Sequence, residues 1–291
     1  MLKIKNINKS FGSNLVLEDI NIRVEENKIY GLLGRNGVGK TTLLNLISNQ
    51  IFSDSGSIKL DGEEVVENPK ALEDICLVKG FPQLMKVKRV NELFTLASLM
   101  YVNWDEDYKD RLVGEFKLDT RKKLNNLSTG QTTVVGLIIG LASRARLTMF
   151  DEPTLGLDSV SRYKFYELLL EDYELNPRTI IISTHLIDEV ANLFEEVIIL
   201  KDKKVLLQEE VDVLKERSYI LSASDQAISP FVKGKQIIYK EKLGERSIVG
   251  IYGDITDKER SDIKSSNIEI SNISLEKLFV YLSENTIKEV I

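Results

Sequence analysis

The chain has 291 residues, 43% hydrophobic and 29% charged, which is the composition of a globular protein rather than of a disordered one. Its length allows one large domain or two modest ones. The net charge of −6 and the pI of about 5.2 argue against nucleic acid as the main partner, because binding to phosphate backbones depends on a surplus of Lys and Arg.

The first part of the chain predicts strands around one helix. Alternating residues in LKIKNI and INIRV predict short strands within residues 1–33, and KIYGLLG predicts a buried strand that runs into glycines. Apolar residues then recur at helical spacing over residues 40–49, and Asp61-Gly62 predicts a hairpin turn. The opening MLKIKNINKS lacks the apolar core of a signal peptide, so no secretion signal is expected.

The middle of the chain alternates predicted helices with apolar strands. Residues 89–117 are expected to be mostly helical, and SRYKFYELLLEDYE predicts an amphipathic helix. RLTMFDEP and RTIIIST predict two short buried strands. Strands of this kind between helices are typical of a covered parallel sheet, so we expect an α/β fold.

Two apolar runs bear on the location of the protein. The run from Val134 to Ala142 is about half the ~20 residues that a membrane span needs, so we expect a soluble or peripheral protein. Cys76, the only cysteine, lies in the apolar run ICLV and predicts a buried thiol. The absence of a disulfide framework suits a reducing compartment.

The character of the sequence changes after about residue 215. SYILSAS, KQIIYK and RSIVGIYG predict short alternating strands, and SLEKLFVYLSEN predicts a closing helix. We therefore expect a first domain over residues 1–216, with a helical subdomain over about 85–135, and a small C-terminal α+β domain over residues 217–291.

A glycine-rich stretch that begins at Gly34 fits the pattern G-x-x-x-x-G-K-[ST]. Its glycines let successive backbone N–H groups point at phosphate oxygens, and the helix that follows adds the partial positive charge of its N-terminus. Lys40 is expected to reach the β and γ phosphates, and the Thr41 hydroxyl to bind Mg²⁺. The predicted phosphate-binding residues are Gly34, Asn36, Gly37, Gly39, Lys40, Thr41 and Thr42.

Polar residues follow two of the predicted buried strands. Asp151 and Glu152 end the strand LTMFD, at the edge where open α/β sheets bind ligands. We expect Asp151 to hold Mg²⁺ and Glu152 to polarise the attacking water as general base. His185, the only histidine, follows TIIIST at the same edge and can donate to a γ phosphate or orient the water. A polar turn and a surface histidine are the alternative interpretations.

Five motifs then occur in order: the phosphate loop, LSTGQ, FDEP, LGLD and STH. Together, over roughly residues 1–215, they resemble the ATP-binding subunits of ABC transporters. The resemblance implies a P-loop NTPase fold of the ABC ATPase type, with a mixed sheet core and a helical subdomain, that binds ATP and Mg²⁺. It makes LSTGQ the signature motif, LGLD the D-loop and His185 the switch histidine.

The resemblance also implies further site residues. Phe11 falls where an aromatic ring stacks on adenine, and Asp158 ends the D-loop. In the signature motif the expected ATP-binding residues are Ser128, Gly130 and Gln131, with the γ phosphate met by Ser128 and the Gly130 N–H.

This sequence departs from the family pattern at three places. Thr129 replaces the usual first glycine of the signature, and Thr132, Thr133 and Val134 replace the basic residues common just after it. Gly80 falls where the family has the glutamine of the glutamine loop, so Gln83 becomes the candidate for the Mg²⁺ contact.

In this family, two ATPase domains enclose two ATP molecules head to tail and drive separate membrane subunits. The resemblance therefore implies a second ATP-binding subunit, either another copy or a paralogue, and integral membrane partners. It places the chain in the cytoplasm, on the inner face of the membrane. SLEKLFVYL and the segment around LIIGLASRARLTMFDEPTLGLD resemble bacitracin-type and other Gram-positive peptide-exporter ATPases, including phenol-soluble-modulin exporters. This subfamily exports amphipathic, antimicrobial or toxin peptides.

Two other functions stay open at the level of sequence. A soluble ABC-type ATPase that acts on ribosomes or DNA usually carries two ATPase units or a coiled-coil insertion, and we find neither. A regulatory module that binds ATP with little turnover would account for Thr129 and the irregular glutamine loop. The intact Lys40, Asp151, Glu152 and His185 favour hydrolysis.

Overall fold

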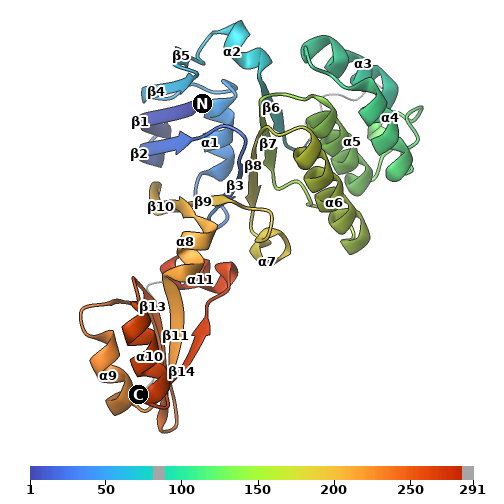
Figure 1. Ribbon diagram of the computed structural model, residues 1–291. Coiled ribbons are helices and arrows are strands. Elements are labelled where there is room, and N and C mark those ends of the chain that lie inside the picture. Colours follow the sequence, from blue (N-terminus) through green and yellow to red (C-terminus); the bar gives the residue numbers. More distant parts are fainter. Residues whose placement is uncertain (81–88, 284–291) are drawn as a thin grey trace. The chain divides into compact units, whose positions relative to one another are not determined.

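The computed structural model describes residues 1–80 and 89–283, which form parts of two compact units (Figure 1). The first unit comprises Met1–His185 and Ile198–Gln208, and the second comprises Leu186–Val197 and Glu209–Ile291.

The first unit is built around a six-stranded sheet. Its strands have the order β10-β9-β3-β8-β7-β6, and β3, β8, β7 and β6 run parallel to one another. β3 is buried at all of its residues, and β8 is buried likewise, because helices or a second sheet cover both faces. The bounds are β3 Ile29–Leu33, β6 Ile75–Val78, β7 Leu147–Asp151, β8 Thr179–Thr184, β9 Glu196–Lys201 and β10 Lys204–Glu210.

A second, antiparallel sheet lies beside it with the order β2-β1-β4-β5. β1 and β2 have 10 and 11 residues, so they are longer than the short strands that the alternation predicts. A register shift between Ile4 and Ile7, where Asn6 has φ 48°, lets both isoleucines face the core. The bounds are β1 Leu2–Phe11, β2 Asn14–Val24, β4 Ser55–Leu60 and β5 Glu63–Glu64.

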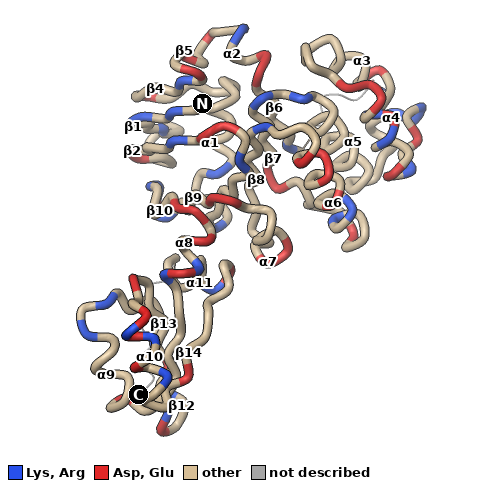
Figure 2. Tube along the Cα trace, viewed as in Figure 1, with Lys and Arg blue, Asp and Glu red and all other residues tan. Residues whose placement is uncertain are grey.

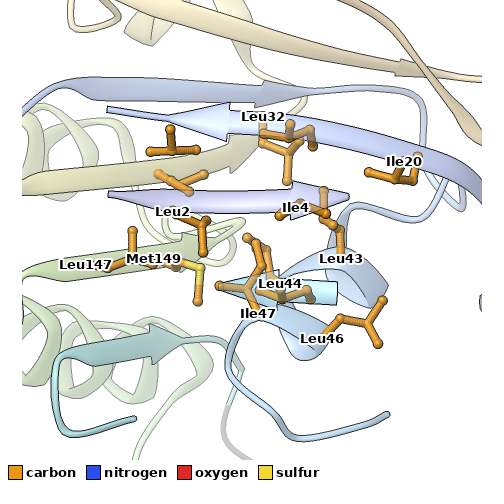
Figure 3. Close-up of a cluster of buried hydrophobic side chains, with 14 of the residues drawn as sticks. Leu2, Ile4, Ile20, Leu32, Leu43, Leu44, Leu46, Ile47, Leu147 and Met149 are labelled. Atoms are coloured by element: carbon orange, nitrogen blue, oxygen red, sulfur yellow. The ribbon is translucent and has the colours of Figure 1, made fainter. Parts of the chain in front are cut away.

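The main core of this unit lies around α1 (Lys40–Ile47). In Figure 3 the apolar side chains of α1 lie beside Leu2 and Ile4 of β1, and Leu147 and Met149 of β7 belong to the same cluster. All four apolar side chains of α1 are at most 2% exposed, so the helix that follows the glycine-rich loop is fixed from both sides.

Most of the remaining helices of the first unit gather beside β6 and β7 (Figure 1). They include α3 and α4, which confirm the predicted helices within 89–117, and α6, which matches SRYKFYELLLEDYEL. The short α2 begins at Pro69, with Asn68 as its N-cap. The bounds are α2 Pro69–Glu73, α3 Val90–Met100, α4 Glu106–Glu115, η1 Leu124–Asn126, α5 Thr129–Ala142 and α6 Ser159–Leu175.

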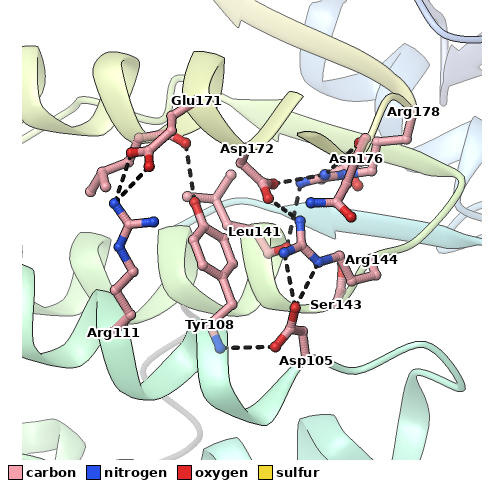
Figure 4. A network of polar contacts seen from close by, with 12 residues as sticks. Asp105, Tyr108, Arg111, Leu141, Ser143, Arg144, Glu171, Asp172, Asn176 and Arg178 are labelled. Atoms are coloured by element: carbon pink, nitrogen blue, oxygen red, sulfur yellow. Dashed lines mark hydrogen bonds and ion pairs between the residues drawn. The ribbon is translucent and has the colours of Figure 1, made fainter. Parts of the chain in front are cut away.

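A polar network joins α4, α5 and α6 (Figure 4). Arg144 follows α5, and its guanidinium bonds Asp105, the N-cap of α4, at 2.9 Å and also Asp172 of α6. Arg178 Nη1 lies 2.8 Å from the other Asp172 oxygen, and Arg144 stacks 4.6 Å from the ring centre of Tyr108. Because Asp172 is 2% exposed, these charges hold three helices together at a nearly dry site.

The second unit contains a four-stranded antiparallel sheet with the order β12-β13-β11-β14. The elements β11-α9-β12-β13-α10-β14 follow one another along the chain, which is the ferredoxin-like βαββαβ arrangement. Tyr219, Leu221, Val249 and Ile251 pack with residues of α9 and α10 in its core. The bounds are α7 Ile187–Val190, α8 Val211–Glu216, β11 Ser218–Ala223, α9 Asp225–Val232, β12 Gln236–Leu243, β13 Arg246–Tyr252, α10 Asp257–Ser265, β14 Glu269–Asn272 and α11 Leu275–Ser283.

The structure bears on the predicted burial of Cys76 and on the expected absence of a membrane span. Cys76 in β6 is a buried free thiol, and burial raises its pKa. Over residues 1–80 and 89–283, no helix has the length and apolarity that crossing a bilayer requires.

Candidate active site

The glycine-rich loop connects β3 to α1. Gly37 and Gly39 have φ of 81° and 114°, in the left-handed region that side chains disfavour. A Cβ on Gly39 would lie 2.6 Å from Leu17 Cδ2 of β2, and one on Gly34 would lie 2.6 Å from Val38 Cγ1. A side chain at either position would therefore displace Leu17 or Val38, and at Gly39 it would also have to adopt the left-handed φ.

Lys40 is the first residue of α1 and is 6% exposed. Its Nζ donates to the Gly34 carbonyl at 2.7 Å, so the side chain curls back over the loop. The N-cap of the helix is Gly39, which has no side chain to accept hydrogen bonds from the first turn. An anion such as phosphate satisfies both the helix N-terminus and the ammonium group.

Asp151 ends β7 beside the loop. Its Oδ2 accepts from the Thr41 hydroxyl at 2.7 Å, and its Oδ1 accepts from Ser183 Oγ at 2.5 Å. Ser183 lies opposite Asp151 in the parallel pairing of β7 and β8, and it is fully buried. Ser183 is the serine of the STH motif, but the sequence predicted no role for it; a hydroxyl near the end of the apolar strand TIIIST is the signal that points to one.

The same residues fit Mg²⁺. The ion prefers hard oxygen ligands and is usually held by one or two protein groups together with substrate phosphates and water. The Thr41 hydroxyl and the Asp151 carboxylate are such oxygens, and they already lie within hydrogen-bond distance of each other. When bound, Mg²⁺ would neutralise charge on the β and γ phosphates. Gln83, the third predicted ligand, lies outside the described residues.

Glu152 lies between a cation and an imidazole. Its Oε1 is 3.5 Å from Lys40 Nζ, and its Oε2 is 2.7 Å from His185 Nδ1. The carboxylate is partly buried, since its side chain is 23% exposed. His185 follows β8, so two neighbouring parallel strands bring this pair together at their carboxyl ends.

The backbone of Glu152 has an unusual conformation. Its φ is 49°, a left-handed value that costs a non-glycine residue of the order of 1–3 kcal/mol. Its N–H donates to the Ser183 carbonyl at 3.0 Å, and its carbonyl accepts from the Leu155 N–H at 3.2 Å. Hydrogen bonds on both sides therefore hold the residue in this conformation.

The signature stretch begins α5. Ser128 is the N-cap, its Oγ accepts from the Gln131 N–H at 3.2 Å, and the Gln131 side chain accepts from the Ser128 N–H at 3.2 Å. This capping box gives Gln131 a structural role at the helix start. Ser128 is exposed and Gly130 partly exposed, beside the helix N-terminus, where an anion is favoured.

Asp158, the last residue of LGLD, is the N-cap of α6 and accepts from the Ser161 N–H at 2.7 Å. This backbone hydrogen bond lowers the pKa of the Asp158 carboxyl, which is therefore charged near neutral pH.

Phe11 at the end of β1 is 52% exposed. Lys9 Nζ lies 5.3 Å from the centre of its ring.

The predicted residues thus fall into two groups. In the first group, Thr41 bonds Asp151, and Lys40 and His185 each contact Glu152. The signature residues and the LGLD loop form the second group. Within residues 1–80 and 89–283, no hydrogen bond or ion pair between side chains joins the signature residues to the phosphate loop.

A phosphate loop between a buried strand and a helix, with an acidic pair at the end of another parallel strand of the same sheet, defines the class of P-loop NTPases. The ABC transporter family profile matches residues 17–155. A search of solved structures finds an ATP-binding subunit of an ABC transporter with TM-score 0.66 and 23% identity, covering 74% of this chain and 92% of that one.

Among its relatives, the ABC transporter ATP-binding protein YtrB of Bacillus subtilis is 31% identical over 205 residues, or 70% of each chain. The bacitracin transport ATP-binding protein BcrA of Bacillus licheniformis is 27% identical over 299 residues, or 97% of each chain. This chain belongs to the ATP-binding subunits of ABC transporters, as the ordered motifs predict, and it is an ATPase.

Proposed function

We propose that this chain powers the export of amphipathic or antimicrobial peptides through separate membrane subunits. The similarity to the bacitracin transport protein supports this proposal because it extends over 97% of both chains and so includes the C-terminal unit. The proposed location is the cytoplasmic face of the membrane, where the chain is held by its membrane partners.

The observation that carries the ATPase mechanism is the placement of Glu152 between Lys40 and His185. In this mechanism Lys40 and the loop N–H groups hold the phosphates, and Glu152 accepts the proton of the attacking water. His185 orients Glu152 and the γ phosphate. Thr41 and Asp151 would hold Mg²⁺, and the exposed Phe11 provides a stacking surface for adenine.

The second group of site residues is proposed to serve a second subunit. Ser128 and the Gly130 N–H lie at a helix N-terminus that suits a γ phosphate, and in the described part of the chain no side-chain hydrogen bond joins them to the phosphate loop. A second copy of the chain supplies the missing partner, since each copy carries both complementary halves. Two ATP molecules are then enclosed head to tail, each between one phosphate loop and the other copy's signature.

We further propose that residues 1–216 are the ATPase domain, with its helical subdomain over about 85–135, and that residues 217–291 are a separate C-terminal domain. The ferredoxin-like order of β11 to β14 supports a domain with its own core.

The alternative of an ATPase that acts on ribosomes or DNA is less well supported. In Figure 2 the Lys and Arg residues are interspersed with Asp and Glu in both units, whereas a nucleic-acid surface gathers positive charge on one face. A module with little turnover is also less well supported, because Lys40, Glu152 and His185 are in contact.

Export is tested in cells that produce the chain with its genomic membrane partners. We expect resistance to an amphipathic antimicrobial peptide with the wild-type chain, its loss with Lys40→Ala, and its retention with Lys70→Ala, an exposed lysine of α2. The tagged chain should also co-purify with a multi-span protein that stimulates its ATPase activity. Association with ribosomes and with no membrane protein would contradict the proposal.

A further inference from the structure

The LGLD loop lies directly on the first turn of α5 in the same chain. A Cβ on Gly130 would lie 2.7 Å from the Gly156 carbonyl oxygen, and a Cβ on Gly156 would lie 2.9 Å from Thr129 Cγ2. Gly156 also has φ 82°. Two glycines therefore permit a contact in which the methyl group of Thr129 packs against the loop.

A side-chain hydrogen bond fixes this contact. Thr133 Oγ1, one turn along α5, donates to the Leu155 carbonyl at 2.9 Å. The Leu155 side chain is 66% exposed, so packing of its own side chain does little to hold that residue. The Thr133 hydroxyl thus restrains the orientation of the peptide group that follows Leu155.

This restraint reaches Glu152 through the backbone. The Leu155 N–H donates to the Glu152 carbonyl at 3.2 Å, and Glu152 has the left-handed φ of 49°. A left-handed backbone conformation of a non-glycine residue persists only where neighbouring groups hold it in place. The Ser183 carbonyl holds the residue on one side, and the turn anchored by Thr133 holds it on the other.

We propose that Thr133 is a positioning residue for ATP hydrolysis. Its hydroxyl couples the start of α5, which carries Ser128, to the turn that sets the backbone of Glu152. Since Ser128 serves the ATP of one site and Glu152 serves the ATP of the other, the hydrogen bond transmits the occupancy of one site to the base of the second. This inference rests on the proposed two-site function.

The test compares Thr133→Val, which removes only the hydroxyl, with Thr133→Ser, which keeps it. Thr132→Val is the matched control, because the Thr132 hydroxyl donates to the Ser128 carbonyl of its own helix at 3.0 Å and not to the loop. Each full-length variant is purified with its membrane partners. ATP affinity is measured with a fluorescent ATP analogue, and kcat and the Hill coefficient are measured by phosphate release.

We expect Thr133→Val to lower kcat about fivefold, which corresponds to about 1 kcal/mol, the size of one hydrogen bond, while ATP affinity stays at the wild-type value. Its Hill coefficient should fall towards one. Thr133→Ser and Thr132→Val should keep the wild-type kcat and Hill coefficient. Because serine keeps the hydroxyl but lacks the methyl group, normal activity of Thr133→Ser would show that the hydroxyl, and not packing of the methyl group, is what Thr133→Val loses.

Two results would overturn the proposal: an unchanged kcat in Thr133→Val, or an equal loss in Thr133→Val and Thr133→Ser. Glu152→Gln, assayed in parallel, separates this failure from failure of the proposed function. If Glu152→Gln is inactive while Thr133→Val is unaffected, only the role of Thr133 is wrong. If Glu152→Gln turns over normally, the proposed mechanism itself is wrong.

Discussion

Glu152 is the residue on which the proposed chemistry depends. It lies 2.7 Å from the imidazole of His185 and 3.5 Å from the ammonium of Lys40. The adjacent Asp151 contacts Thr41 and Ser183 instead. The two consecutive carboxylates thus have different partners. Those of Asp151 suit metal binding, and those of Glu152 suit the role of general base.

We expect Glu152→Gln to lower kcat at least about 100-fold, because general-base catalysis typically contributes that much, while ATP affinity is retained. Lys40→Ala should instead abolish tight ATP binding, since it removes the buried cation of the loop. The two variants are compared by equilibrium ATP binding and by single-turnover hydrolysis. A Glu152→Gln variant with nearly normal turnover would remove Glu152 from the role of base.

The arrangement of helices α4, α5 and α6 depends on buried charges. Asp172 contacts Arg144 and Arg178, whose side chains are 14% and 6% exposed. Removing one partner from a buried pair is costly because it leaves an uncompensated charge. The neighbouring Glu171 also pairs with an arginine, Arg111, but that pair is nearly half exposed, and exposed pairs contribute little.

Asp172→Asn is therefore expected to lower the free energy of unfolding by about 3 kcal/mol, whereas Glu171→Gln should change it by less than about 1 kcal/mol. Denaturant unfolding followed by tryptophan fluorescence measures both, since Trp104 lies in the same unit, next to Asp105. Equal effects of the two variants would show that burial of the Asp172 cluster contributes nothing to stability.

The sequence predicted elements well where one physical signal dominated. The fully apolar runs of β3 and β8 and the glycine pattern before α1 are local, and the structure has these elements where they were expected. In the C-terminal unit, the sequence analysis predicted strands but neither α9 nor α10. Helix α10, DKERSDIKS, buries only Ile263, so it carries almost no apolar periodicity.

Part of the candidate site could be predicted because some of its residues belong to local sequence motifs. Motif spacing identified Lys40, Asp151 and Glu152, whereas Ser183 and Thr133 act through contacts with residues 32 and 22 positions away in the chain. No local pattern encodes such contacts. From the sequence alone, Thr133 is only a departure from the basic residues that the family has just after the signature.

For the whole molecule, the central claim is that one active site is shared between two copies. Each chain carries an intact phosphate loop and a signature motif that departs from the family pattern at Thr129, and no hydrogen bond between side chains joins the two over residues 1–80 and 89–283. Closure of a dimer around ATP would complete both sites at once, which couples ATP binding to movement of the membrane subunits.

The most direct measurement is ATPase complementation between two inactive variants co-expressed with different tags. Lys40→Ala disables the phosphate loop, and Ser128→Glu places a negative charge where the signature meets the γ phosphate. Each variant alone should be inactive, whereas the mixed dimer keeps one intact site. Random pairing makes half of the dimers mixed, each with one of its two sites intact, so the restored rate is expected to be at most about a quarter of the wild-type rate, and lower where hydrolysis needs ATP at both sites. A mixture as inactive as its components would contradict the shared site.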